Sequence, residues 1–181
     1  MTIAGKIEDH IAIPDGVTVS MDGNALKVKG PKGELCRTFS HPTVVVAIAD
    51  GVVTVSCEYP RIKEKAMVGT FRAHIRNMFR GVTEGYSYQL KIVQSHFPMK
   101  VTVNDKAKRI EVANYMGGHA IRTANIVGDA KVKISGTDVT VTGISIEDVG
   151  QTAANMEKAT QRGGFDKRVF EDGIYIVKKS R

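Results

Sequence analysis

The sequence contains few cysteines and no long apolar run, and these absences exclude several classes of protein. Only Cys36 and Cys57 occur among the 181 residues, which is a poor basis for a disulfide scaffold or a four-ligand zinc site. The longest apolar run, Val44 to Ile48, is far too short to cross a bilayer, and the N-terminal residues lack the apolar region of a signal peptide. We therefore expect a soluble protein of a reducing compartment, cytoplasmic and without a membrane partner.

Sequence patterns typical of catalytic, cofactor and metal sites are also absent. There is neither a Walker motif nor a dinucleotide-binding fingerprint. The histidines are scattered, and none has the i, i+4 spacing or the cysteine pair typical of a metal site: His10, His41, His74, His96 and His119. The segment 30–33 fits the GxxG form of an RNA-binding clamp, but its place in a predicted hairpin indicates a turn. We expect no enzymatic activity, no cofactor and no metal.

Positive charge is what the chain has in excess. Its 26 lysines and arginines against 19 aspartates and glutamates give a formal net charge of +7. An excess of this sign favours a polyanionic partner without identifying it.

The chain also repeats itself. The tripeptide Val-Thr-Val occurs four times, with spacings of 36 residues in the first half and 38 in the second: Val17–Val19, Val53–Val55, Val101–Val103 and Val139–Val141. Gly69–Ala73 and Gly150–Ala154 then occupy the same place after the last copy of each half. This pattern predicts a module of about 80 to 90 residues used twice. We place the two modules at residues 1–82 and 83–181.

Short runs rich in threonine and valine, separated by glycine, aspartate and asparagine, are typical of β-strands. We expect strands near 17–21, 25–29, 34–39, 44–48 and 52–56, and near 100–104, 108–113, 120–124, 131–135 and 138–142, with a strand at 86–94 leading between the modules. Short loops favour antiparallel pairing, and one helix closes each half. The predicted fold is α+β: two tandem modules, each a mostly antiparallel sheet covered by one helix.

The first predicted helix, 61–80, carries a basic face. Arg72, Arg76 and Arg80 are four residues apart, so like charges face one another at a cost unless something anionic lies near. One interpretation is a solvated face partly neutralised by acidic residues from elsewhere. The other is a contact surface for RNA or an acidic protein, and the sequence leaves both open. The second helix, 147–160, carries nothing that suggests chemistry.

The C-terminal tract, 161–181, has no counterpart after the first helix. It carries six basic and three acidic residues, and its adjacent glycines permit the backbone to approach a phosphate closely. Arginines and lysines on a loop held by a strand can make directed phosphate contacts, so we interpret them as binding residues. For the aromatic side chains of Phe165, Phe170 and Tyr175 we prefer core packing over stacking on bases.

Four segments resemble a known family. The stretch Arg168–Ile176, with 149–155 before it, is similar to the large-subunit ribosomal protein L6 family in its archaeal and eukaryotic form. The segments 94–99 and 125–132 also resemble that family. The resemblance runs over nearly the whole chain, and its C-terminal signature is specific. The segment from Phe165 to Gly173 departs from the shorter Gly-Lys-rich tail of bacterial members and follows the archaeal pattern.

The resemblance implies a non-catalytic structural role in the large ribosomal subunit. It implies binding to large-subunit ribosomal RNA near the sarcin–ricin loop and the translation-factor-binding region, which stabilises RNA tertiary structure. Neighbouring ribosomal proteins would be partners, with translation factors nearby. Carried over to this sequence, the RNA-binding residues are Arg162, Gly163, Gly164, Lys167, Arg168, Lys178, Lys179 and Arg181. The main alternative is a free-standing RNA-binding regulator built from the same basic modules.

Overall fold

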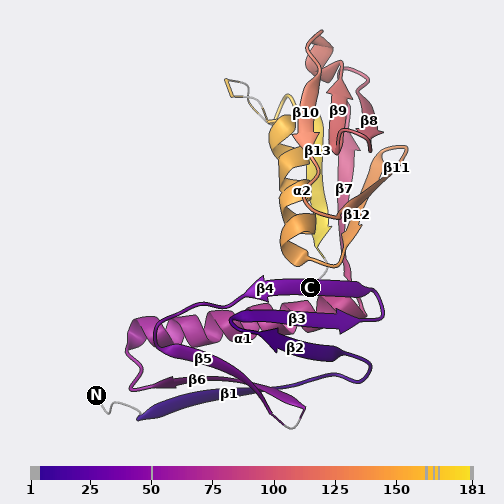
Figure 1. Ribbon diagram of the computed structural model, residues 1–181. Helices are drawn as coiled ribbons and strands as arrows, with labels where there is room; N and C mark the ends of the chain where they lie inside the picture. Colours follow the sequence, from indigo (N-terminus) through magenta and orange to yellow (C-terminus); the bar gives the residue numbers. More distant parts are fainter. Residues whose placement is uncertain (1–4, 50, 162, 165, 167, 180–181) are drawn as a thin grey trace. The chain divides into compact units, whose positions relative to one another are not determined.

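The protein folds as two compact units, Met1–Gly85 and Tyr86–Arg181. The computed structural model describes residues 5–49, 51–161, 163–164, 166 and 168–179 (Figure 1). The division falls three residues beyond the end of the first predicted module.

Unit 1 consists of two small antiparallel sheets and one long helix. Its elements are β1 (Lys6–Ala12), β2 (Thr18–Asp22), β3 (Ala25–Gly30), β4 (Gly33–Thr38), β5 (Val44–Ala49), β6 (Val52–Glu58) and α1 (Ile62–Thr83). The sheets have the strand orders β1-β6-β5 and β2-β3-β4, and α1 packs against both (Figure 1). Gly30 pairs with Gly33, so the GxxG segment is the hairpin turn that the sequence predicted.

The helix α1 has clear start and stop signals. The Glu64 side chain accepts a hydrogen bond of 3.0 Å from the backbone N–H of Arg61, which satisfies one donor of the first turn. At the other end, the N–H of Gly85 bonds the carbonyl of Arg80, and Gly85 has the positive φ that closes many helices. The buried face includes Phe71 and Ile75, as the helical periodicity predicts.

Unit 2 repeats this plan and adds one strand. Its elements are β7 (Tyr86–Val93), β8 (Lys100–Asn104), β9 (Arg109–Ala113), η1 (Tyr115–Gly117), β10 (Arg122–Asn125), β11 (Lys131–Ser135), β12 (Asp138–Gly143), α2 (Ile146–Ala159) and β13 (Gly173–Lys179). The sheets have the orders β10-β9-β8 and β11-β12-β7-β13, and α2 packs against strands of both. Ser145 caps α2 by accepting a hydrogen bond from the backbone N–H of Asp148 at 3.3 Å.

The strand register shows which elements are equivalent. Val53 pairs with Ile11 between β6 and β1, and Val139 pairs with Leu90 between β12 and β7. Because Val53 and Val139 belong to equivalent Val-Thr-Val copies, β1 and β7 occupy the same place in the two units. The strand at 86–94 is therefore a central strand of unit 2. The strand β1, which the sequence did not predict, is its counterpart in unit 1.

The α+β prediction is confirmed, with a refinement. The strands of each unit form two sheets that share one helix, rather than a single sheet. The core of unit 2 joins residues from both sheets and from α2, among them Ile110, Val139 and Met156, all fully buried. In the part of the chain described above, no helix is both long enough and apolar enough to span a bilayer.

Candidate nucleic-acid interface

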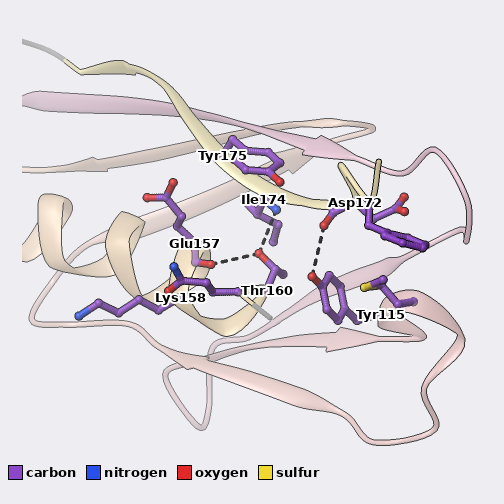
Figure 2. A pocket seen from close by; sticks show the side chains of 10 residues that line it. Tyr115, Glu157, Lys158, Thr160, Asp172, Ile174 and Tyr175 are labelled. Atoms are coloured by element: carbon purple, nitrogen blue, oxygen red, sulfur yellow. Dashed lines mark hydrogen bonds between the residues drawn. The ribbon is translucent and has the colours of Figure 1, made fainter. Parts of the chain in front are cut away.

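The basic tract after α2 is held at both ends by hydrogen bonds within unit 2. The hydroxyl of Thr160 donates to the carbonyl of Glu157 at 3.2 Å and accepts from the N–H of Ile174 at 3.0 Å, as Figure 2 shows. This side chain therefore ties the end of α2 to the start of β13. The residues described between Gln161 and Gly173 belong to no helix or strand, and we call this stretch the loop.

Arg122, on β10, fixes the same end of the helix. Its Nη1 donates to the carbonyl of Ala159 at 2.9 Å and to that of Gln161 at 3.3 Å, which satisfies helix-end acceptors. Its guanidinium also lies 4.4 Å from the centre of the Tyr115 ring, a cation–π distance. A cation is favourable at this end because the helix dipole is negative there.

The far end of the loop is anchored by Asp172, a buried carboxylate. Its oxygens accept hydrogen bonds from the backbone N–H groups of Ser95 and His96, and the ring Nδ1 of His96 lies 2.7 Å away. Burial alone would raise the pKa of Asp172. The hydrogen bonds from His96 and Ser95 outweigh burial and hold that pKa below its ordinary value. The carboxylate is therefore an ionised, structural group.

Two aromatic side chains support this anchor. The hydroxyl of Tyr115 donates to the carbonyl of Asp172 at 3.3 Å, and the ring of Phe170 lies 5.5 Å from the ring of His96 (Figure 2 labels Tyr115 and Asp172). The expectation of core packing is thus met only in part, because Phe170 is half-buried while Tyr175 is 36% exposed. Phe165 lies outside the described residues.

Within the described part of the tract, the basic side chains that the sequence singled out are exposed and have no ion pair. These are Arg168, Lys178 and Lys179. Gly163 and Gly164 are exposed in the loop, whereas Arg162, Lys167 and Arg181 lie outside the described residues. The described members fall into two groups, because β13 separates the loop from Lys178 and Lys179 by about 20 Å of extended chain.

A hollow of about 300 Å³ lies where α2, η1 and β13 meet (Figure 2). Two of its polar side chains, Thr160 and Tyr115, are already used inside the protein, because they bond backbone groups. In the described ranges no group of three or more histidine, cysteine, aspartate or glutamate residues could hold a metal ion. The features that distinguish this part of the molecule are its exposed cations and its fixed loop ends.

The basic face of α1 is partly neutralised in the structure. Arg72 lies 3.3 Å from Asp9 on β1, and Arg80 lies 2.9 Å from Glu84. Arg76 is exposed and has no ion pair among the residues that the structure describes. This arrangement matches the solvated-face interpretation for two of the three arginines, and a contact surface around Arg76 stays a prediction.

Comparison with known proteins identifies the family. The sequence model of the family described as ribosomal protein L6 matches residues 13–85 and 97–173, one segment in each unit. The chain belongs to the ribosomal protein L6 family. The resemblance read from the sequence is therefore confirmed, and so is the absence of enzymatic activity, since the L6 family consists of structural ribosomal proteins.

Relatives match along nearly their whole length. The large ribosomal subunit protein uL6 of Methanobrevibacter smithii is 48% identical over 179 residues, which cover 99% of both chains. Its namesake in Methanosarcina mazei is 46% identical over 97% of this chain and 98% of the relative. That of Desulfurococcus amylolyticus is 48% identical over 96% and 95% respectively. These archaeal L6 proteins agree with the archaeal form of the resemblance.

Three residues that organise this L6 tract were not recognised from the sequence: Arg122, Thr160 and Asp172. The role of Asp172 was not visible in the sequence, because its partners Ser95 and His96 lie more than 70 positions earlier. The sequence did contain one signal that such contacts exist, because the tract has no counterpart in the first half of the repeat. A segment found in one L6 module only must be attached by contacts that the other module lacks.

Proposed function

We propose that this chain is a structural constituent of the large ribosomal subunit that binds large-subunit ribosomal RNA through unit 2. The observation that carries the proposal is the family match in both units, together with full-length relatives named large ribosomal subunit protein uL6. The resemblance further suggests a position near the sarcin–ricin loop and the translation-factor-binding region. Neighbouring ribosomal proteins would be partners, and the site of action would be the cytoplasm.

The geometry of the basic tract supports RNA contact by this unit. Arg168 lies on the loop, and Lys178 and Lys179 lie on β13, so these cations are presented from anchored backbone. Cations without protein partners release counterions from RNA when they meet phosphates, which favours binding at moderate salt. Because the two groups lie about 20 Å apart along β13, they can contact two separate phosphate runs and fix their relative placement.

The test is binding of the purified chain to large-subunit ribosomal RNA across a salt series, with a non-ribosomal RNA of equal length as competitor. The proposal expects a preference for ribosomal RNA that persists near physiological salt. The variant carrying Lys178→Ala and Lys179→Ala should reduce the log–log salt slope by about one unit per lost contact. Lys63→Ala, at an exposed site on α1, is the matched control and should leave the slope unchanged.

Equal, steeply salt-dependent binding to both RNAs would contradict this proposal. An unchanged slope in the double variant would remove Lys178 and Lys179 from the interface. Co-sedimentation with large ribosomal subunits is an independent test, because a constituent of the subunit stays bound to the subunit through moderate salt.

A further inference from the structure

The duplication leaves one sheet edge covered in unit 2 and uncovered in unit 1. In unit 2, β13 pairs with the outer edge of β7. The equivalent strand in unit 1 is β1, and among the described residues it pairs with β6 alone. An edge strand presents a row of backbone donors and acceptors that can pair with another extended chain.

A groove of about 390 Å³ lies beside this edge, between β1 and the C-terminal half of α1. Its lining includes two buried apolar side chains, Ile11 from β1 and Phe79 from α1. Exposed His10, Arg76 and Arg80 also line it. The groove therefore combines apolar surface and cationic side chains with a strand edge.

The groove and the hollow of unit 2 occupy equivalent places. Gly69–Ala73 and Gly150–Ala154 align with an offset of 81 residues, and the buried pairs Val68 with Val149 and Ile75 with Met156 keep that offset. The same offset matches Phe79 with Thr160, which line the groove and the hollow respectively. In unit 2 this place is where β13 begins, with Ile174 fully buried.

From this equivalence we propose that the outer edge of β1 and its groove bind an extended, acidic segment of a partner protein. The segment adds antiparallel to β1, as β13 adds to β7. It places an apolar side chain toward Phe79, where unit 2 has Ile174. Unit 1 has Phe79 where unit 2 has Thr160, so it offers no hydroxyl to hold the bound segment. The segment is held by backbone pairing and apolar contact instead.

The preference for an acidic segment follows from the charges. Arg76 is exposed and has no ion pair within the described residues, and it stands where unit 2 has Glu157. Arg80 also lines the groove, although Glu84 neutralises it in part.

In the register of unit 2, Tyr175 pairs with Lys91, which is equivalent to Ala12 in the lining of the groove, whereas Lys178 and Lys179 would fall opposite His10 and Asp9. The charge preference therefore concerns the first half of the added strand. An acidic residue there would meet Arg76, for which the described part of the chain offers no ion pair.

Two synthetic seven-residue probes test the proposal, both copied from Gly173–Lys179. The acidic probe has glutamate in place of Tyr175, Lys178 and Lys179, and the basic probe has lysine in place of Tyr175. Each is titrated into the full ¹⁵N-labelled chain while amide resonances and amide hydrogen exchange are recorded. The expected result is saturable shifts confined to β1 and the second half of α1, with slower exchange of β1 amides, for the acidic probe.

Charge-reversal variants identify the site. Arg76→Glu should weaken binding of the acidic probe about fivefold, the size expected for an exposed ion pair that is reversed, and should favour the basic probe. Lys63→Glu makes the same charge change about 20 Å away on α1 and should have no effect. Because both positions are exposed, the amide spectra should show that each variant keeps its fold.

Four outcomes would overturn the proposal. The first is no saturable shift with the acidic probe, and the second is shifts at other strand edges, such as β4 or β5. The third is protection of β1 by self-association of the chain without any probe. The fourth is occupation of the same groove by an RNA oligonucleotide while the acidic probe leaves it unchanged. None of these results bears on ribosomal RNA binding by unit 2, so the two proposals fail separately.

Discussion

The ends of the two helices differ although the helices descend from one repeated pattern. Near the C-terminal end of α1, Phe79 is one of the buried residues, and the chain leaves through the turn at Gly85. At the same place in α2 the buried residue is Thr160, whose hydroxyl binds the backbone of Ile174. The end of α1 therefore has an apolar ring at this position, whereas the end of α2 has a hydroxyl that holds the start of β13.

This difference shows how an added segment can be attached to a duplicated module. The strand β13 enlarges one sheet of unit 2 from three strands to four, and its attachment uses polar groups that have no counterpart in unit 1. Asp172 and Thr160 fix the loop between them, and the loop carries part of the predicted RNA-binding tract. The RNA contact that we propose for unit 2 therefore lies on the segment that unit 1 lacks.

Removing residues 173–181 should have the largest effect on stability, because unit 2 would then lack a strand equivalent to β13, as unit 1 does. We expect a loss of more than about 5 kcal/mol in the free energy of unfolding of unit 2, since fully buried Ile174 and an entire strand pairing disappear. Amide hydrogen exchange, followed separately for the residues of each unit, measures this loss of stability. A chain ending at Lys179 is the control, and full protection of α2 in the shorter chain would contradict the prediction.

Asp172→Ala should give the next largest loss of stability in unit 2. The backbone donors of Ser95 and His96 lose a charged acceptor, which costs about 2 to 3 kcal/mol in the stability of unit 2. Denaturant unfolding, followed by a probe in each unit, should show unit 1 unchanged. Asp129→Ala removes an exposed carboxylate of the same unit and should have almost no effect. Equal losses in the two variants would show that Asp172 is not an anchor.

Thr160→Val tests the helix-end difference directly. The variant keeps the shape of the side chain but leaves the buried N–H of Ile174 without its acceptor, at a cost of about 1 to 2 kcal/mol. Thr160→Ser retains the hydroxyl and should recover most of that loss. Faster exchange of the Ile174 amide in the valine variant would locate the effect at the start of β13. A serine variant as unstable as the valine variant would contradict it.

The pH dependence of stability should also distinguish the units, by a smaller amount. The pKa of Asp172 is lowered on folding, so the unfolded chain binds more protons, and stability is lost as pH falls through the folded pKa, below about pH 4. Glu8 in unit 1 also has a lowered pKa, because Lys6 hydrogen-bonds it, but it is exposed and solvent screens that pair. Unit 2 should therefore lose more stability in acid, and Asp172→Asn should remove the difference.

The sequence predicted the repeat, both helices and most strands, because valine-threonine alternation and helical periodicity are local signals. It did not predict β1, whose Ile7 and Ile11 lie four apart with charged residues between them, so the alternation of a strand is obscured. It also did not predict that each unit divides its strands into two sheets. Pairing partners are chosen by contacts far apart in sequence, which periodicity does not contain.

The residues of the candidate site also fall into those that the sequence predicted and those that it did not. The basic residues of the tract were visible because charge is a property of composition and position. The groups that hold the tract were not, since Arg122 reaches α2 from β10 and Asp172 reaches the segment after β7. When the role of a residue depends on a distant backbone atom, the neighbouring sequence contains no pattern that reveals it.

Gly163→Ala should affect RNA binding without changing stability. A Cβ at Gly163 would meet nothing within 4 Å, and the backbone there has no positive φ, so the folded chain accepts alanine. If the loop brings its backbone to a phosphate, the added methyl group should weaken ribosomal RNA binding about threefold to tenfold. Gly69→Ala on α1 is the matched control, because a Cβ there also meets nothing, and it should bind RNA as the unchanged chain does. Equal affinity of both variants would show that the backbone at Gly163 does not approach a phosphate closely, and Gly163 would then leave the predicted interface.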